Sequence, residues 1–174
     1  MSAFTSPAIV DGFLKDEYGI NTPEKDRIVY GIPKRSLPLE WSEVPAGTES
    51  LAIICMDYMN AEDEGVPWVH WLVSDIPADK TGLADDEAAT GTLVEGMTSW
   101  ALPYGPYEEI PDEAAIGYGG PAPGRTHEYE FELYAFDAKP QLERGFYINA
   151  LRKFAEEHTI EKAVLKVNYR GSEE

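Results

Sequence analysis

Residues 67–77 read Pro-Trp-Val-His-Trp-Leu-Val-Ser-Asp-Ile-Pro, an apolar stretch enclosed by two prolines with one histidine in its first half. Length and composition predict one β-strand, in which alternate side chains point to opposite faces. Both faces are mostly apolar, with His70, Leu72, Ser74 and Ile76 on one and Val69, Trp71, Val73 and Asp75 on the other. Such a strand belongs inside a sandwich, so the imidazole of His70 is expected near the core, where it needs a partner.

A second histidine begins another strand, residues 127–136, which read His-Glu-Tyr-Glu-Phe-Glu-Leu-Tyr-Ala-Phe. Strict alternation predicts one buried face and one wet face. The buried face would carry His127, Tyr129, Phe131 and Leu133, and the wet face would carry Glu128, Glu130 and Glu132. His127 and Tyr129 are therefore expected to point inward together.

The remaining segments predict a mainly β fold. Further strands are expected at residues 50–57 and 163–169, and apolar residues recur at helical spacing within residues 144–157. Prolines separate the short strands of the first half, as in turns and sheet edges. Together these elements indicate a β-sandwich with a small, late helical addition, organised as a single domain over residues 1–174. Residues 97–123, rich in Gly, Pro and Tyr, are expected to form a long functional loop.

Charge and composition exclude several classes of protein. The formal net charge of −18 speaks against nucleic-acid binding, which needs clustered Lys and Arg. No apolar run approaches the roughly 20 residues needed for a transmembrane helix, so no stable membrane insertion is expected. The N-terminal residues show no secretory pattern, which predicts a cytoplasmic location. Cys55 is the only cysteine; it excludes an internal disulfide and is expected in the core.

The two strand histidines suggest a ligand site if they converge. Each alone is more often a hydrogen-bonded structural histidine than a ligand-binding one. If their strands were neighbours, both imidazoles, the Tyr129 hydroxyl and a polar group from residues 57–60 could meet, with the backbone N–H groups of Gly119 and Gly120 nearby. Such a pocket would offer many donors and little fixed charge. This chemistry suits a small phosphate or carboxylate group.

Three competing site types receive weaker support. Two histidines and an aspartate can hold zinc, but no His-x-His or His-Glu-x-x-His spacing is present, so no metal site is predicted. Ser74 and Ser99 lie outside any Gly-x-Ser-x-Gly elbow, which disfavours a hydrolase. The Gly-rich stretch lacks the Gly-Lys-Ser/Thr ending of a nucleotide-binding loop. No cofactor and no enzymatic activity are therefore expected.

Several motifs, in order, resemble one family. They are Ser-Leu-Pro-Leu-Glu-Trp at 36–41, Val-Pro-Ala-Gly-Thr-Glu-Ser at 44–50, Trp-Val-His-Trp at 68–71, Gly-Gly-Pro-Ala-Pro-Gly-Arg-Thr-His-Glu-Tyr at 119–129 and Leu-Tyr-Ala-Phe-Asp at 133–137. The chain from about residue 6 to 170 resembles the phosphatidylethanolamine-binding protein family in its prokaryotic Raf-kinase-inhibitor-like (YbhB/YbcL-type) branch.

The resemblance implies a two-sheet antiparallel β-sandwich with a C-terminal helix and a shallow pocket for phosphate, phosphoryl head groups such as phosphoethanolamine, or carboxylates. It carries His70, His127 and Tyr129 onto the family's pocket positions, with Trp68, Gly120 and Pro121 as lining. It also implies a homodimer and permits a protein partner.

One motif departs from the family pattern. The usual Asp-Pro-Asp-Ala-Pro stands here as Tyr-Met-Asn-Ala-Glu at residues 58–62. Asn60 can still form a hydrogen bond but supplies no negative charge, and Asp57 is the candidate to replace the missing carboxylate from one position earlier. The expected loss of charge would make the pocket friendlier to anions.

Three functions follow, in order of preference. The first is a small-ligand binding protein whose pocket captures a phosphoryl or carboxylate group. The second is an interaction module that modulates a kinase or protease through the pocket rim and the loop 97–123. The third is a hydrolase that uses the paired histidines as acid and base.

Overall fold

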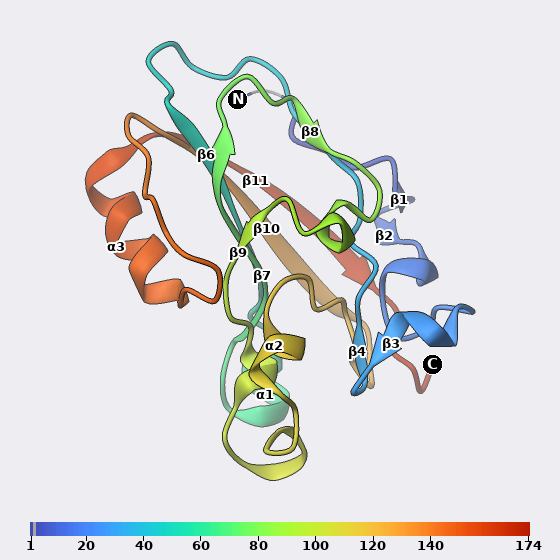
Figure 1. The fold of residues 1–174 in the computed structure, drawn as a ribbon. Helices are drawn as coiled ribbons and strands as arrows, with labels where there is room; N and C mark the ends of the chain where they lie inside the picture. Colours follow the sequence, from blue (N-terminus) through green and yellow to red (C-terminus); the bar gives the residue numbers. More distant parts are fainter. Residues whose placement is uncertain (2) are drawn as a thin grey trace.

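The fold, described by a computed structural model over Met1 and residues 3–174, is built on one long sheet (Figure 1). Seven strands lie in the order β1-β2-β11-β10-β6-β7-β9. Their bounds are β1 Ile9–Val10, β2 Phe13–Leu14, β6 Ser50–Asp57, β7 Trp68–Pro77, β9 Val94–Glu95, β10 His127–Phe136 and β11 Thr159–Tyr169. Neighbours run antiparallel except β2 and β11, which meet in parallel.

The expectation of a mainly β fold is confirmed, but the two large antiparallel sheets are not found in the described chain. Two short ribbons stand in place of a second sheet: β3 (Ile28–Val29) pairs with β4 (Ile32–Pro33), and β5 (Leu39–Glu40) pairs with β8 (Gly82–Leu83). Pro33, Pro38 and Pro45 interrupt this region. Because proline cannot donate to a β-ladder, pairing stops after two residues.

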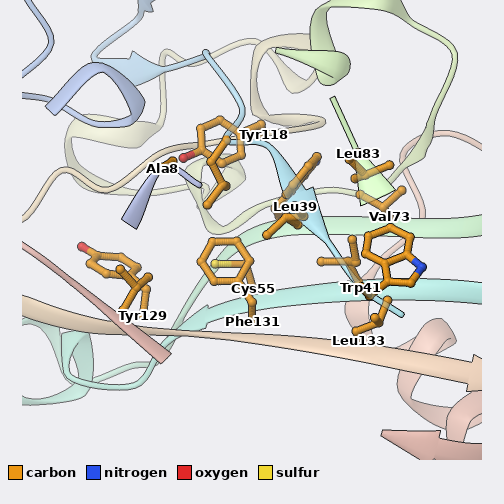
Figure 2. Packing of buried hydrophobic residues seen from close by; sticks show 14 of the residues in the cluster. Ala8, Leu39, Trp41, Cys55, Val73, Leu83, Tyr118, Tyr129, Phe131 and Leu133 are labelled. Carbon is orange, nitrogen blue, oxygen red and sulfur yellow. The ribbon is translucent and has the colours of Figure 1, made fainter. Parts of the chain in front are cut away.

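Both faces of the sheet are buried at its central strand β6. Along β6, Leu51, Ile53 and Cys55 belong to a large cluster shared with β5 and β8, where Leu39, Leu83 and Trp41 gather over the sheet (Figure 2). The alternate residues Ala52, Ile54 and Met56 pack on the other face beneath helix α3, Ile148–His158. The predicted helix thus exists, and β11 follows it. Cys55 is buried in the core as expected.

The predicted wet face of β10 is wrong at Glu132, which is buried. Helix α3 and β11 cover this position and supply two cations: Arg152 lies 2.7 Å and Lys162 lies 3.0 Å from the Glu132 carboxylate oxygens. The Tyr134 hydroxyl also donates to this carboxylate at 3.0 Å. A buried carboxylate is tolerated when it is paired and hydrogen-bonded, and these partners provide both.

A β-bulge in β7 changes which residues share a face. Cys55 pairs with Trp71 and Met56 pairs with Val69, so His70 is an extra residue on β7. A bulge puts two consecutive side chains on the same side. Trp71 therefore joins His70 on the side of the large cluster, whereas Leu72 packs beneath α3. The predicted grouping of His70 with Leu72 is wrong, and the bulge turns the imidazole toward Tyr129.

The two short α-helices and the loop 97–123 gather at one end of the sheet. Helices α1 (Asn60–Glu64) and α2 (Asp112–Ala115) lie there together (Figure 1). The loop is held against the segment that follows β4 by Lys34, whose Nζ donates to the carbonyls of Ala114 and Ile116 at 3.1 and 3.2 Å. Burial lowers the pKa of Lys34 to about 8. Among the described helices, none has the length and apolar character needed to cross a bilayer.

Candidate functional site

A cavity of about 610 Å³ opens at the end of the sheet where β6 stops and where β7 and β10 begin. Asp57 ends β6, Trp68 begins β7 and His127 begins β10, so three adjacent strand ends deliver these side chains to one place. Helix α1, the loop 97–123 and the β3–β4 turn form the walls. Further lining residues include Tyr30, Asn60, Asp63, Glu64, His70, Trp100, Tyr107 and Tyr129.

His127 lies between two carboxylates. Its Nδ1 is 2.6 Å from Asp57 Oδ2, and its Nε2 is 2.7 Å from Asp63 Oδ2. Ionised carboxylates only accept hydrogen bonds, so each ring nitrogen donates to its partner, and this arrangement requires the imidazolium form. The ring is buried at 2% side-chain exposure. His127 is therefore a double donor whose Nδ1 is fixed inside the protein and whose Nε2 faces the cavity side.

Asp57 anchors this ring. Its side chain is 4% exposed, and its second oxygen, Oδ1, accepts the backbone N–H of Asn60 at 3.0 Å. Asn60 in turn donates through its side-chain amide to the carbonyl of Val66 at 2.8 Å. Both oxygens of Asp57 are thus occupied. A carboxylate held this way sets the orientation of the imidazole that it accepts from.

Asp63 approaches His127 from the solvent side. It lies on α1, its side chain is 38% exposed, and its Oδ1 accepts from Arg125 Nε at 3.1 Å. Arg125 also pairs with Glu62 at 3.0 Å. Partial desolvation acts to raise the pKa of Asp63, but hydrogen bonds from Arg125 and His127 outweigh it and hold this pKa below its usual range.

His70 has the opposite character to His127. Its Nδ1 lies 2.7 Å from the Gly119 carbonyl, which can only accept, so Nδ1 carries the proton and the neutral ring presents Nε2 as an acceptor. Burial lowers the pKa of His70 to about 4. The ring packs edge-on against Trp100 and Tyr129, with 5.0 Å between centroids in each pair.

Two donors in the cavity wall make no hydrogen bond to the described part of the chain, and one of them, the Trp68 indole, is fully buried. The other is the hydroxyl of Tyr129, a residue that is 1% exposed overall and lines the cavity. Burial raises its pKa well above the ordinary value, which keeps the hydroxyl protonated. The indole Nε1 of Trp68 is buried and likewise unpaired there. Unpaired buried donors are uncommon in folded proteins and favour a ligand that accepts hydrogen bonds.

The cavity carries more negative charge than the sequence predicted. Asp57, Asp63 and Glu64 line it, against the single imidazolium of His127. Arg125 is the cation at its edge, paired with Glu62 and Asp63. The expectation of little fixed charge is wrong because Asp57 replaces the missing carboxylate and α1 folds its acidic residues over the strand end.

Comparison with known proteins identifies the chain's relatives. The family model described as phosphatidylethanolamine-binding protein matches residues 5–170. The chain belongs to the phosphatidylethanolamine-binding protein family. A UPF0098 protein of Methanothermobacter thermautotrophicus is 35% identical over 136 residues, covering 78% of this chain and 82% of the relative. YbhB of Escherichia coli is 37% identical over 103 residues, 57% of this chain and 58% of YbhB.

A solved structure agrees with this assignment. The crystal structure of a phosphatidylethanolamine-binding protein homologue from Chlamydia trachomatis superposes with a TM-score of 0.72 at 25% identity and covers 97% of both chains. The family resemblance predicted from the ordered motifs is therefore confirmed.

Six of the eight residues predicted for the pocket line the cavity of this family member: Asp57, Asn60, Trp68, His70, His127 and Tyr129. Gly120 and Pro121 do not line it; Ala122, Pro123 and Gly124 do. The expected backbone donors are also absent from it, because Gly119 N–H donates to the His70 carbonyl and Gly120 N–H donates to the Pro33 carbonyl. Gly119 contributes to the site through its carbonyl, which accepts the hydrogen bond from His70 Nδ1, and not through its N–H.

The two histidine strands are not neighbours, contrary to the condition placed on their meeting. Strand β6 lies between β7 and β10. The Tyr129 ring connects the two imidazoles across β6: its centroid lies 5.0 Å from the centroid of the His70 ring and 6.5 Å from that of the His127 ring. The bulge at His70 contributes by directing that imidazole to the same side of the sheet as Tyr129.

Sequence reasoning missed Asp63 and Arg125. The run Glu62-Asp63-Glu64 belongs to the five-residue helix α1, which returns over the end of β6. Two signals were available: three carboxylates close behind Asp57, and an arginine two residues before His127. Neither signal says that the chain folds back, because that depends on the left-handed turn at Gly65, with φ of 83°.

Proposed function

We propose that this protein binds a small ligand through a phosphoryl or carboxylate group in the cavity, with His127 and Tyr129 as the main donors. One observation carries the proposal: His127 Nε2 already holds a carboxylate, that of Asp63, at 2.7 Å. A position that accommodates one carboxylate suits an oxygen of a ligand's anionic group. Hydrogen bonds between ionised partners are about twice as strong as neutral ones.

The other cavity groups fit this ligand chemistry. The Tyr129 hydroxyl adds a donor, and the Trp68 indole N–H, buried and unpaired among the described residues, adds a second. Neutral His70 supplies an acceptor at Nε2, which suits the P–OH of a phosphate monoanion. Asp57 keeps the His127 ring oriented during binding.

We propose a binding role in preference to hydrolysis. The two serines considered as nucleophiles are engaged elsewhere: the Ser99 hydroxyl accepts the Val69 N–H at 2.8 Å, and the Ser74 hydroxyl donates to Asp75 at 2.8 Å. A nucleophile must lie within hydrogen-bond reach of its base, and neither serine has a histidine as partner. A protein partner and a homodimer stay predictions of the family resemblance, and a cytoplasmic location stays a prediction from the N-terminal sequence.

An NMR titration tests the binding role. Inorganic phosphate and, separately, phosphoethanolamine are added to the wild type, His127→Ala and Tyr129→Phe, and the dissociation constants are compared. His127→Ala is expected to lose at least about tenfold in affinity because it removes a charged donor, and Tyr129→Phe about fivefold because it removes one neutral hydrogen bond.

His158→Ala provides the matched control. This third histidine lies at the end of α3, where it pairs with Asp137 at 2.8 Å, away from the cavity. Its replacement is expected to leave phosphate affinity unchanged. Equal affinities of the wild type and His127→Ala for both ligands would refute the proposed site.

A further inference from the structure

We propose that α1 is a displaceable acidic plug, in which Asp63 occupies the anion position of the cavity and must leave before a ligand binds. The inference rests on the proposed function and adds its regulation. It starts from the contact between Asp63 Oδ2 and His127 Nε2, 2.7 Å apart, inside a cavity that both residues line.

Ligand and plug exclude one another because His127 has one donor to give. Its Nδ1 proton is committed to Asp57, whose side chain is buried and whose other oxygen accepts the Asn60 N–H. Only the Nε2 proton remains, and Asp63 takes it. Two anionic oxygens at that one donor would also repel each other, and so an incoming phosphoryl oxygen displaces the carboxylate.

Asp63, on the plug helix α1, can move more easily than Asp57, which fixes the His127 ring from inside the protein. Asp63 is 38% exposed, whereas Asp57 is 4% exposed. Helix α1 has five residues, buries none of them, and ends at Gly65 in the left-handed region. Segments with few buried contacts open at low free-energy cost. Withdrawing the Asp63 end of α1, while Asn60 at the other end keeps its bond to Asp57, therefore leaves the core and the Asp57–His127 pair in place.

Besides the Asp63–His127 bond, two exposed contacts hold the plug closed. Arg125, from the segment before β10, binds Asp63 Oδ1 and Glu62. Tyr107, from the loop 97–123, donates its hydroxyl to Glu64 at 2.9 Å. Exposed ion pairs and hydrogen bonds of this kind contribute little stability each. The closed state therefore depends mainly on the Asp63–His127 bond, which a ligand replaces with its own anionic oxygen when it binds the open form.

The consequence is an affinity set by the open fraction. A ligand that binds only the open form shows an apparent affinity reduced by the fraction of molecules that are open. Removing the Asp63 carboxylate makes every molecule open at His127 Nε2. The variant Asp63→Ala should therefore bind inorganic phosphate more tightly than the wild type, by at least about tenfold if one molecule in ten is open.

Glu109→Ala is the matched control for the loss of charge. Glu109 is exposed on the loop 97–123, between the cavity-lining residues Tyr107 and Ile110, and no ion pair among the described residues joins it to α1, Arg125 or His127. The inorganic phosphate dissociation constants of wild type, Asp63→Ala, Asp63→Asn and Glu109→Ala are measured by NMR titration. We expect a large gain for Asp63→Ala, an intermediate gain for Asp63→Asn, which keeps an acceptor without charge, and less than about a twofold change for Glu109→Ala.

The outcomes separate the plug from the binding function. If the wild type binds phosphate through His127 but Asp63→Ala binds no more tightly, the plug is refuted and the function stands. An equal gain in Glu109→Ala also refutes the plug, because general charge then explains the effect. If Asp63→Ala shows no phosphate binding at all, the plug and the proposed function fall together.

Discussion

His70 and His127 are the same residue type in one cavity, and their partners give them opposite roles. A carbonyl accepts from His70 Nδ1, so the ring stays neutral and offers an acceptor. Two carboxylates accept from His127, so that ring is a charged double donor. Alternation along the strands predicted that both rings face inward. It could not predict their protonation, which depends on residues from other elements.

The neutral state of His70 predicts an acid-dependent loss of stability. Burial lowers its pKa from 6.5 to about 4, so between these values the unfolded chain binds a proton that the folded chain does not. Unfolding is therefore favoured progressively as the pH falls through this window, and the stability is retained above it. The group should account for a loss of about 3 kcal/mol between pH 7 and pH 4.

Urea denaturation at several pH values measures this contribution. His70→Gln, whose amide can still donate to Gly119, should flatten the fall in the free energy of unfolding across the window. His158→Gln removes a half-buried histidine outside the cavity and should keep the steep fall. An identical slope in the wild type and His70→Gln would contradict the assignment.

At the scale of elements, strands were predictable and their irregularities were not. Residues 50–57, 67–77 and 127–136 show apolar content and alternation strong enough to fix their type. The bulge at His70 carries no glycine or proline to mark it, and it exists because β7 must match the register of β6. Helix α1 is too short for a periodic signal. The site depends on both the bulge and helix α1. The sequence therefore predicts which residues line the site better than it predicts how they are arranged.

Two distant parts of the loop 97–123 meet at a close contact that a methyl group should disrupt. A Cβ on Gly119 would lie 2.4 Å from a ring atom of Trp100, which packs against His70 and Trp68. Gly119→Ala should therefore lower the free energy of unfolding by about 1–3 kcal/mol, as overpacking does, and shift the tryptophan fluorescence. Chemical denaturation followed by fluorescence measures both.

Gly124→Ala is the control for this contact. A Cβ there meets only the Glu173 carboxylate at 3.6 Å or more, an ordinary contact distance. Its free energy of unfolding should change by less than about 0.5 kcal/mol. If Gly119→Ala were as stable as Gly124→Ala, the Trp100 wall would not be closely packed.

At the scale of the whole molecule, a large acidic excess surrounds a sheet whose central strand is buried on both faces. The chain has 32 acidic and 14 basic side chains, a net charge of −18. Some ion pairs join two exposed groups, as between Lys166 and Glu128, with side-chain exposures of 54% and 46%. Such pairs contribute at most about 1 kcal/mol each. The excess of acidic groups leaves a net self-repulsion, which opposes the compact state.

Salt should therefore stabilise this protein. Raising NaCl from 10 mM to 500 mM shortens the screening length from about 30 Å to roughly 4 Å, which removes long-range repulsion first and leaves contact pairs less affected. A gain of about 1 kcal/mol corresponds to a rise in Tm of roughly 2–4 °C for a chain of this size. Sodium sulfate at the same ionic strength separates screening from preferential exclusion, because screening alone gives equal shifts whereas exclusion favours sulfate. A Tm that falls with NaCl would mean that the local pairs, including those that hold α1 to Arg125, outweigh the repulsion of the acidic surface.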